Sequence, residues 1–215
     1  DKEDTIRIIC GGPGSGKSSF GRMLAAHLAE TETRPVLFIP LHELNLSGDL
    51  VTSINNFVQS GPSDEALPPN LLDGTYAKQQ VLLIFDGLDE LAMQGTVATK
   101  AAQDFIWKVQ KMLRGFNQSQ GRVLALISGR DLAVQAIAPE FQRAGQILHL
   151  LPYFQSQEEQ QQREAGLDEE GRVLLKEDQR QAWWQTYGLL KAKPYIGLPD
   201  ELNQGKLVEI TAPPL

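Results

Sequence analysis

The sequence predicts an α/β protein: a three-layer sandwich built on a five-stranded, mainly parallel β-sheet. The first observation is that an apolar run enters the glycine-rich segment 11–18 and a helical pattern leaves it. The second is the apolar run 81–85, because a continuous apolar strand is typical of a central parallel strand covered on both faces. The third is the number of apolar runs of strand length. They span residues 6–10, 36–39, 81–85, 123–127 and 147–151.

The composition fits one α/β domain with a small appendage. The chain has 215 residues, of which 41% are hydrophobic, enough for a core. Its formal net charge of -7 argues against a general nucleic-acid-binding surface. No apolar run reaches the roughly 18 residues that a membrane helix needs, and the charged segment 1–4 is not a signal peptide. The single cysteine, Cys10, cannot form an internal disulfide, which suits a cytoplasmic protein.

The segment 11–18 matches the pattern G-x-x-x-x-G-K-[ST] of a phosphate-binding loop. Its glycines let successive backbone N–H groups point at phosphate oxygens, and the following helix adds its own N-terminal N–H groups. Lys17 is expected to reach the β- and γ-phosphates, and Ser18 to offer its hydroxyl to Mg²⁺. The alternative is a glycine-rich loop that binds nothing. Because a strand enters the motif and a helix leaves it, the sequence predicts the P-loop NTPase form of the α/β fold. The nucleotide-binding candidates are Gly11, Gly12, Pro13, Gly14, Ser15, Gly16, Lys17, Ser18 and Ser19.

The first half of the chain is predicted to hold two helices besides its strands. The helix after the loop runs to about Ala29 and shows an apolar stripe at helical spacing. That stripe comprises Phe20, Met23, Leu24, His27 and Leu28. Pro40 ends the strand 36–39, and Asp49 is placed to cap a second helix through its side chain. The stripe of the second helix comprises Ile54, Phe57 and Val58. Residues 61–70 contain three prolines and are expected to form a loop.

The second half begins with the strand 81–85 and continues with a helix that Gly115 stops. The stripe of this helix comprises Ala102, Phe105, Ile106, Val109, Met112 and Leu113. A strand at 123–127, a short helix at about 132–138 and a last strand at 147–151 complete the predicted core.

Beyond the core the character of the sequence changes. We expect an NTPase core at 1–152 and, at 153–215, a polar and helical extension leading into a truncated small helical domain. A stretch rich in Gln and Glu, 155–181, has no assigned role. The aromatic residues Trp183, Trp184 and Tyr187 are expected to pack a helix onto its neighbour, with an interaction surface as the alternative. The chain starts without Met and ends on Pro-Pro-Leu, so we expect a piece of a longer protein.

Polar residues follow the apolar strands where a ligand would bind. In parallel sheets, ligands bind beyond the carboxyl ends of the strands, which places the P-loop and Asp86 at one edge. Asp86 is expected to hold Mg²⁺ as a Walker B aspartate does. Asp89 and Glu90 are candidates to orient or deprotonate the attacking water. Arg130, after the strand 123–127, is expected to sense and stabilise the γ-phosphate.

Each of these residues also has a plain alternative reading. Asp86 is in a position where a turn or capping residue is common, and Asp89 and Glu90 fit a solvated turn. Arg130 fits a surface salt bridge. The three histidines, His27, His42 and His149, lack ligand spacing, so no metal other than Mg²⁺ is expected.

The strand order bears on the choice of nucleotide. The strand 36–39 lies between the P-loop strand and the Walker B strand in sequence, and we expect an added strand to lie between them in the sheet. This arrangement is that of ATPases with an added catalytic carboxylate. The base-reading motif Asn-Lys-x-Asp of GTPases does not occur in the sequence. ATP or ADP is therefore the expected ligand, with Mg²⁺.

The residues around Asp86 resemble a known family. Residues 82–91 read Leu-Leu-Ile-Phe-Asp-Gly-Leu-Asp-Glu-Leu, similar to the extended Walker B motif of NACHT NTPases. Residues 126–130, Leu-Ile-Ser-Gly-Arg, resemble the sensor-arginine strand, which is often written with Thr-Ser-Arg, so that Gly129 departs from the pattern. Residues 213–215 are similar to the proline–leucine element that opens the small helical domain.

The resemblance implies more than the residues do by themselves. NACHT modules are the nucleotide switches of STAND signalling proteins, including NOD-like receptors of innate immunity and bacterial antiviral (antiphage) relatives. The resemblance implies that the protein has a closed state with ADP bound and forms a homo-oligomer with ATP bound. It also implies that a proline after the core contacts adenine, with Pro213 or Pro214 as the match.

Three functions remain open from the sequence. The leading hypothesis is a switch module that binds ATP, hydrolyses it slowly and controls oligomerisation of a larger protein. The second is a small-molecule kinase that uses the same P-loop and a lid with arginines, for which Arg163, Arg172 and Arg180 are candidates. The third is a nucleotide-binding scaffold whose hydrolysis is vestigial.

Overall fold

The structure is a computed structural model of the chain. It describes residues 4–31, 35–61, 80–94, 98–118, 123–154, 161, 178–193, 197–205 and 207–211. The strands are β1 (Ile6–Cys10), β2 (Val36–Pro40), β3 (Val81–Asp86), β4 (Val123–Gly129) and β5 (Ile147–His149). The α-helices are α1 (Lys17–Thr31), α2 (Leu50–Ser60), α3 (Ala98–Phe116), α4 (Asp131–Ile137), α7 (Arg180–Leu190) and α8 (Leu207–Thr211). Short 3-10 helices are η1 (Leu41–Glu43), η3 (Leu88–Gln94), η4 (Ala138–Glu140) and η5 (Asp200–Asn203).

The described chain divides into two compact units. The first comprises Asp1–Gly12 and Lys17–His149, and the second comprises Pro13–Gly16 and Leu150–Leu215. The sheet belongs to the first unit, whereas α7, η5 and α8 belong to the second.

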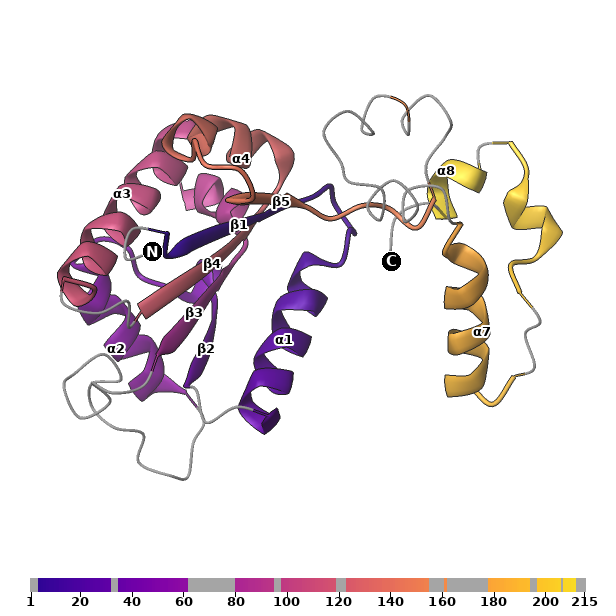
Figure 1. The fold of residues 1–215 in the computed structure, drawn as a ribbon, viewed down its shortest axis with the longest axis horizontal. Coiled ribbons are helices and arrows are strands. Elements are labelled where there is room, and N and C mark those ends of the chain that lie inside the picture. Colours follow the sequence, from indigo (N-terminus) through magenta and orange to yellow (C-terminus); the bar gives the residue numbers. More distant parts are fainter. Residues whose placement is uncertain are drawn as a thin grey trace. The chain divides into compact units, whose positions relative to one another are not determined.

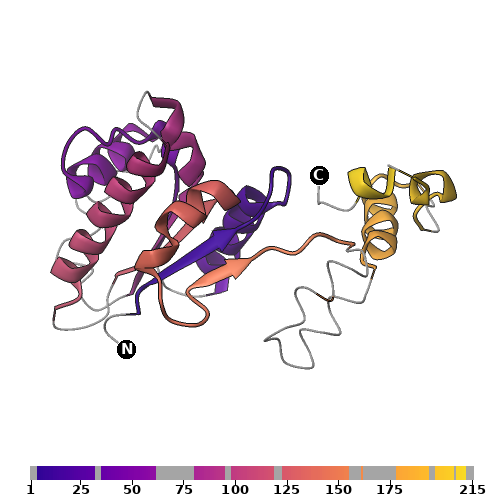
Figure 2. The ribbon, with the colours of Figure 1, turned by 90° about the horizontal axis from the view of Figure 1, so that it is seen from above.

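The sheet has five strands in the order β2-β3-β4-β1-β5, and every neighbouring pair is parallel. Figures 1 and 2 show the strands side by side, with helices on both faces. The predicted α/β sandwich is therefore confirmed, including an added strand between the P-loop strand and the Walker B strand. The identity we gave that strand was wrong: β4 lies between β1 and β3, whereas β2 lies at the edge beside β3. Strands that follow each other in sequence need not be neighbours in a parallel sheet, because the connection between them crosses over the sheet and can pass other strand positions.

Helix α1 covers one face of the sheet, over β2, β3 and β4 (Figure 1). A Cβ on Gly21 would lie 3.0 Å from the ring of Phe38 in β2, so the helix packs closely here. The predicted stripe of α1 is displaced by one residue. Phe20 and Met23 are 42% and 72% exposed, and the buried or half-buried positions form the stripe Gly21, Leu24, Ala25 and Leu28. The apolar residues predicted the helical period of the buried face correctly. Its position was wrong by one residue, because Gly21 makes the close contact with the sheet.

Helix α3 lies on the opposite face and contributes six residues to the core. All six residues of its predicted stripe are buried, which confirms that prediction. The ring of Phe105 meets Phe85 of β3 edge to face, with centroids 5.2 Å apart, an arrangement that aromatic pairs favour. Helix α3 ends at Phe116, one residue past the predicted stop at Gly115. The predicted cap of α2 is also confirmed, because the Asp49 side chain accepts a hydrogen bond from Thr52 N.

The second unit is organised around a buried arginine. The side chain of Arg180, at the start of α7, is only 2% exposed. It donates hydrogen bonds to Asp178 (2.6 and 2.9 Å), to Asn203 in η5 (2.8 Å) and to Thr211 in α8 (3.2 Å). Its guanidinium also lies 4.2 Å from the ring centroid of Phe154. One side chain thus joins the described helices of this unit. It is therefore unsuited to serve as a lid arginine of a kinase.

Replacing Arg180 with Met is expected to destabilise the second unit by roughly 2 to 4 kcal/mol. This value lies near the lower end of the range for broken buried ion pairs, because Asp178 is partly exposed. The measurement is urea unfolding followed by tryptophan fluorescence in a Trp107→Phe background, since the other two tryptophans both lie in α7. Lys191→Ala, which removes an exposed cation from the same unit, is the control and should change stability by less than about 0.5 kcal/mol. Equal stability of the Arg180 variant and the control would contradict this role.

The same pair makes this stability depend on pH. The hydrogen bond from Arg180 holds the pKa of Asp178 below its ordinary value, against the opposing effect of burial. A lowered folded-state pKa means that folding favours the carboxylate, so its contribution is present above the unfolded-state pKa. It is lost as the pH falls through the folded-state pKa. The stability difference between the wild type and Arg180→Met should therefore shrink in acid.

Several predicted features concern segments that the structure does not describe. Most of the Gln/Glu-rich stretch lies outside the described residues, as do Arg163, Arg172 and the proline–leucine element with Pro213. Trp183 and Tyr187 stack with centroids 5.1 Å apart, and Tyr153 lies 6.4 Å from Trp183, so these aromatics pack within the second unit. Among the described helices, none has the length and apolarity needed to cross a membrane.

Candidate functional site

The phosphate-binding loop leaves the carboxyl end of β1 and enters α1 at Lys17. Gly14 and Gly16 have φ angles of 69° and 83°, in the left-handed region that residues with a Cβ rarely adopt. A Cβ on Gly12 would meet no atom within 4 Å, so this part of the loop is open. The loop backbone therefore has the glycine-dependent curvature that a phosphate-binding loop requires. Its described conformation fits the predicted ligand.

Lys17 lies at the centre of the charged groups of this edge. Its ammonium donates to the carbonyl oxygens of Gly11 (2.7 Å) and Gly12 (2.8 Å). Burial lowers the pKa of Lys17 below its ordinary value; the negative charge of Asp89 opposes this shift, and Asp86 opposes it more weakly. The predicted phosphate-binding lysine thus lies within electrostatic range of two of the three predicted carboxylates, Asp86 and Asp89. Its ammonium contacts the carbonyl oxygens of its own loop.

Asp86 is the last residue of β3 and is held by the neighbouring strand. Ser128 of β4 donates its hydroxyl hydrogen to Asp86 Oδ1, and the same hydroxyl oxygen accepts a hydrogen bond from Gly87 N at 3.1 Å. Ser128 is 4% exposed; its hydrogen bond with Gly87 N is buried, and its hydrogen bond with Asp86 is partly buried. Sequence reasoning did not identify Ser128 as a site residue. The one signal available in sequence was its place two residues before Arg130, at the end of a predicted strand.

Asp89 and Arg130, predicted as separate catalytic residues, contact each other. Arg130 Nε lies 2.8 Å from Asp89 Oδ2, and Arg130 N donates to Asp89 Oδ1 at 3.1 Å. The Arg130 side chain is 55% exposed, whereas that of Asp89 is 21% exposed. The arginine also precedes α4 as its N-cap residue, with an extended backbone. In this state the sensor candidate pairs with a catalytic candidate.

Glu90 has a partner that the sequence did not suggest. Its Oε2 lies 2.8 Å from His42 Nδ1 in η1, the short helix after β2. Both side chains are accessible, at 41% and 59% exposure respectively. His42 also lies 3.5 Å from Glu43. The spacing of 48 residues between His42 and Glu90 gave no sequence signal.

The structure gives a steric reason for the glycine in each of two motifs, Gly87 in the Walker B segment and Gly129 in Ser-Gly-Arg. Gly87 has a φ of 91°, and a Cβ there would lie 2.8 Å from the Glu90 side chain. A Cβ on Gly129 would lie 3.0 Å from the Cβ of Leu88 and 3.3 Å from Val134. The Gly in Ser-Gly-Arg therefore has a steric reason, because β4 passes close to η3 at this point.

These residues fit a nucleotide with Mg²⁺. Lys17 and the loop N–H groups suit phosphate oxygens, and Ser18 with Asp86 supplies the oxygen ligands that Mg²⁺ prefers. Ser18 and Ser19 are exposed at the start of α1. The adenine contact predicted for Pro213 lies outside the described residues.

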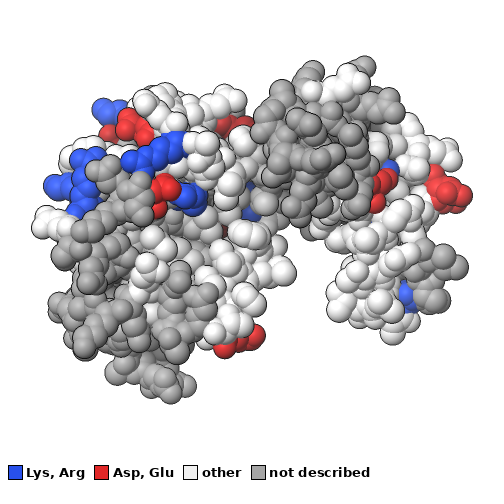
Figure 3. Space-filling model, viewed as in Figure 1, with Lys and Arg blue, Asp and Glu red and all other residues white. Residues whose placement is uncertain are grey.

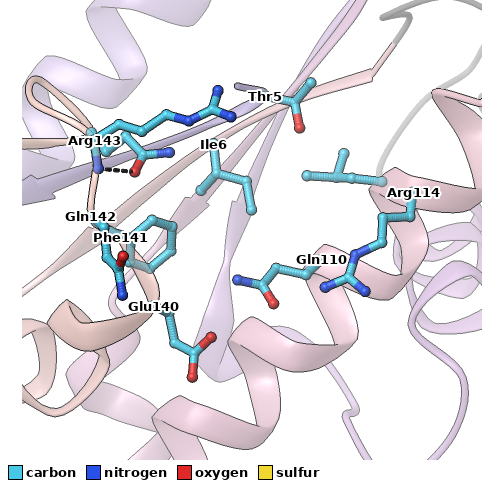
Figure 4. Close-up of a pocket in the computed structure, with 10 residues that line it drawn as sticks. Thr5, Ile6, Gln110, Arg114, Glu140, Phe141, Gln142 and Arg143 are labelled. Carbon is cyan, nitrogen blue, oxygen red and sulfur yellow. Dashed lines mark hydrogen bonds between the residues drawn. The ribbon is translucent and has the colours of Figure 1, made fainter. Parts of the chain in front are cut away.

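A cavity elsewhere in the first unit lies at the other edge of the sheet. It has a volume of about 560 Å³ and is lined by Ile6 at the start of β1, by Arg114 of α3 and by Glu140 and Arg143 (Figure 4). Ile6 begins β1, whereas the phosphate-binding loop follows its other end. None of the residues that line this cavity is a predicted nucleotide-binding residue.

The face drawn in Figure 3 carries charges of both signs on the described residues of the first unit. In Figure 3, Lys and Arg side chains gather over the part of the first unit that contains α3, with Asp and Glu side chains among them.

Comparison with known proteins identifies the family. A model of the NACHT domain matches residues 5–167, so the chain belongs to the NACHT domain family. The P-loop NTPase fold and the nucleotide-binding class follow from this membership. A comparison with curated proteins found no significant match.

Solved structures with similar folds are remote. The Aeropyrum pernix ORC2 protein in its ADPNP–ADP complexes is 14% identical and has a TM-score of 0.43, covering 68% of this chain and 42% of its own. Drosophila ORC bound to DNA is 13% identical, with a TM-score of 0.43 and coverages of 75% and 42%. The E. coli MS115-1 HORMA:CdnC:Trip13 complex is 14% identical, with a TM-score of 0.43 and coverages of 96% and 73%. This chain thus spans less than half the length of the first two.

Replacing Ser128 with Ala is expected to weaken Mg²⁺-dependent ATP binding by roughly tenfold or more, as loss of the hydrogen bond that orients a metal ligand does. It also leaves the buried Gly87 N–H without its acceptor, at a cost of about 1 to 3 kcal/mol in stability. The measurements are ATP titrations with and without Mg²⁺, together with thermal unfolding. Ser60→Ala, which removes an exposed hydroxyl at the end of α2, is the control. Unchanged Mg²⁺ dependence in Ser128→Ala would show that Ser128 does not position Asp86.

Proposed function

We propose that this chain is an ATP-binding, slowly hydrolysing switch module that controls oligomerisation of a larger signalling or defence protein. Membership of the NACHT family supports nucleotide binding. The observation that carries the proposal is the group of charged side chains at the carboxyl edge of the sheet. Arg130 pairs with Asp89 at 2.8 Å, and the charges of Asp89, Arg130 and Asp86 act on Lys17. These four side chains come from the P-loop, the end of β3, η3 and the end of β4.

Each residue has a distinct role in this proposal. Lys17 binds the β- and γ-phosphates by charge-assisted hydrogen bonds. Ser18 and Asp86 hold Mg²⁺, which when bound neutralises charge on the phosphate oxygens. Asp89 and Glu90 are the candidate bases: the chosen carboxylate orients the attacking water and accepts its proton.

The pairing of Asp89 with Arg130 supplies a mechanism for switching. Arg130 is more than half exposed, so its guanidinium is free to rotate away from the carboxylate towards a phosphate. A γ-phosphate offers the arginine a competing anion of higher charge, and binding there releases Asp89 to hold water. ADP offers no such competitor. The ADP state therefore keeps the ion pair, and the ATP state breaks it.

The test is the nucleotide content of the purified chain and the effect of exchange on its size. Protein is denatured, and the released nucleotide is identified by ion-exchange chromatography. ADP at about one per chain supports the closed state of the switch. Exchange for a non-hydrolysable ATP analogue with Mg²⁺, followed by light scattering, should then raise the molar mass. A chain that binds both nucleotides and keeps one mass with either would contradict control of oligomerisation.

A further inference from the structure

Three side chains that could ligate a metal meet beside the P-loop. Cys10 ends β1, and its Cα partners across the sheet are Gly129 of β4 and His149 of β5. Asp131 follows two residues after Gly129, in the first turn of α4. Because residues paired across a parallel ladder present their side chains on the same face, Cys10 and His149 point to one side. The topology thus brings together residues that are far apart in sequence: Cys10 and Asp131 are separated by 121 positions.

The geometry of the group is close. The ligand atoms of Cys10, Asp131 and His149 all lie within 4.8 Å of one another. Cys10 Sγ donates to Asp131 Oδ1 at 3.0 Å, and its side chain is buried, with the residue 2% exposed. Asp131 and His149 are exposed. One ligand is therefore fixed in the sheet, and the other two can adjust their side chains to an ion.

We propose that Cys10, Asp131 and His149 form a binding site for a single Zn²⁺-type cation. A thiolate, an imidazole nitrogen and a carboxylate are the ligands that Zn²⁺ accepts in tetrahedral sites, at about 2.0 to 2.3 Å from the metal. Those bond lengths bring ligand atoms within about 4 Å of each other. The Cys10 and Asp131 atoms already lie 3.0 Å apart, and all three ligand atoms lie within 4.8 Å of one another, so small side-chain movements would complete the site. Three protein ligands leave the fourth position for water on the exposed side.

This site differs in chemistry from the expected Mg²⁺ site. Ser18 and Asp86 offer oxygen only, which suits Mg²⁺, whereas a sulfur ligand selects softer ions. The hydrogen bond between Cys10 and Asp131 accounts for two members of the group but not for the position of His149. Cys10 is followed in the chain by Gly11, whose carbonyl oxygen accepts a hydrogen bond from Lys17. A bound ion would therefore lie beside the start of the P-loop. The proposal does not rest on the nucleotide switch.

The test is a titration of the whole chain with Co²⁺, a spectroscopic substitute for Zn²⁺. Cys10 is the only cysteine in the sequence, so a near-ultraviolet band from a thiolate–cobalt bond reports this residue alone. We expect the band to saturate at one Co²⁺ per chain, to disappear on addition of Zn²⁺ and to persist with excess Mg²⁺. A titration without any thiolate band would overturn the proposal.

Variants separate the ligands from the fold. His149→Ala alters an exposed residue and should leave circular dichroism unchanged while weakening Co²⁺ binding at least about tenfold. His27→Ala, an exposed histidine of α1, is the matched control and should bind as the wild type does. Cys10→Ser should lose the band. A His149 variant with the affinity of the control would overturn the three-residue site, whatever becomes of the cysteine variant.

Discussion

Replacing Lys17 with Ala is expected to lower the affinity for ATP by roughly a hundredfold or more. The lysine would contact two phosphates, and each charge-assisted hydrogen bond contributes about 1.5 to 3 kcal/mol. No other lysine takes part in the described contacts of this edge, and Arg130, the other cation there, is paired with Asp89. The measurement is isothermal titration with ATP and Mg²⁺.

The control for this variant is Lys111→Ala. Lys111 is an exposed lysine of α3 whose ammonium lies 5.2 Å from the ring centroid of Trp107, away from the P-loop. Removing it changes the net charge by the same amount and should leave ATP affinity unchanged. Circular dichroism confirms that both variants are folded. If Lys17→Ala bound ATP as tightly as Lys111→Ala, the assignment of the phosphate-binding loop would fail.

The double replacement Asp89→Asn and Glu90→Gln is expected to slow ATP hydrolysis by roughly 10² to 10⁴ while sparing ATP binding. This is the usual contribution of a positioned base, and both substitutions keep the size of the side chain. Because hydrolysis is expected to be slow, the measurement is single-turnover conversion of labelled ATP. Nucleotide affinity is measured in parallel, so that a loss of binding is not mistaken for a loss of catalysis.

A matched control exists in the second unit, where Asp200 and Glu201 are an exposed Asp-Glu pair in η5. The variant Asp200→Asn with Glu201→Gln changes the charge equally and should hydrolyse ATP as the wild type does. The single variants then identify the base. Asp89→Asn also removes the partner of Arg130, and Glu90→Gln weakens the contact with His42. Wild-type turnover in the double variant would remove both carboxylates from catalysis.

The fold was largely predictable because each strong signal is local. The apolar run of β3 and the periodic stripe of α3 depend on residues near each other in sequence, and both agree with the structure. The order of the strands could not be predicted from the sequence. No residue pattern in the strand 36–39 indicates that this strand lies at the edge of the sheet and that β4 pairs with β1 instead. The stripe of α1 was displaced because Gly21, which has no apolar side chain, makes its close contact with the sheet.

The site was predictable only where a motif fixes it. The P-loop and Asp86 could be predicted as site residues because a local motif places each of them directly after an apolar strand. Ser128 and His42 were missed, since their hydrogen bonds join residues 42 and 48 positions apart. The group at Cys10 was missed for the same reason: His149 has no ligand spacing in sequence and meets the cysteine only through the pairing of β1 with β5. Contacts across the sheet have no local pattern.

The most direct test of the central claim is a titration of the nucleotide-stripped chain with ATP and with ADP, each with and without Mg²⁺. We expect saturable binding of both nucleotides at one per chain, with ATP binding strengthened by Mg²⁺ and weakened when Asp86 is replaced with Ala. The absence of binding to either nucleotide, by a chain shown to be folded, would contradict the assignment of this sheet edge as a nucleotide site.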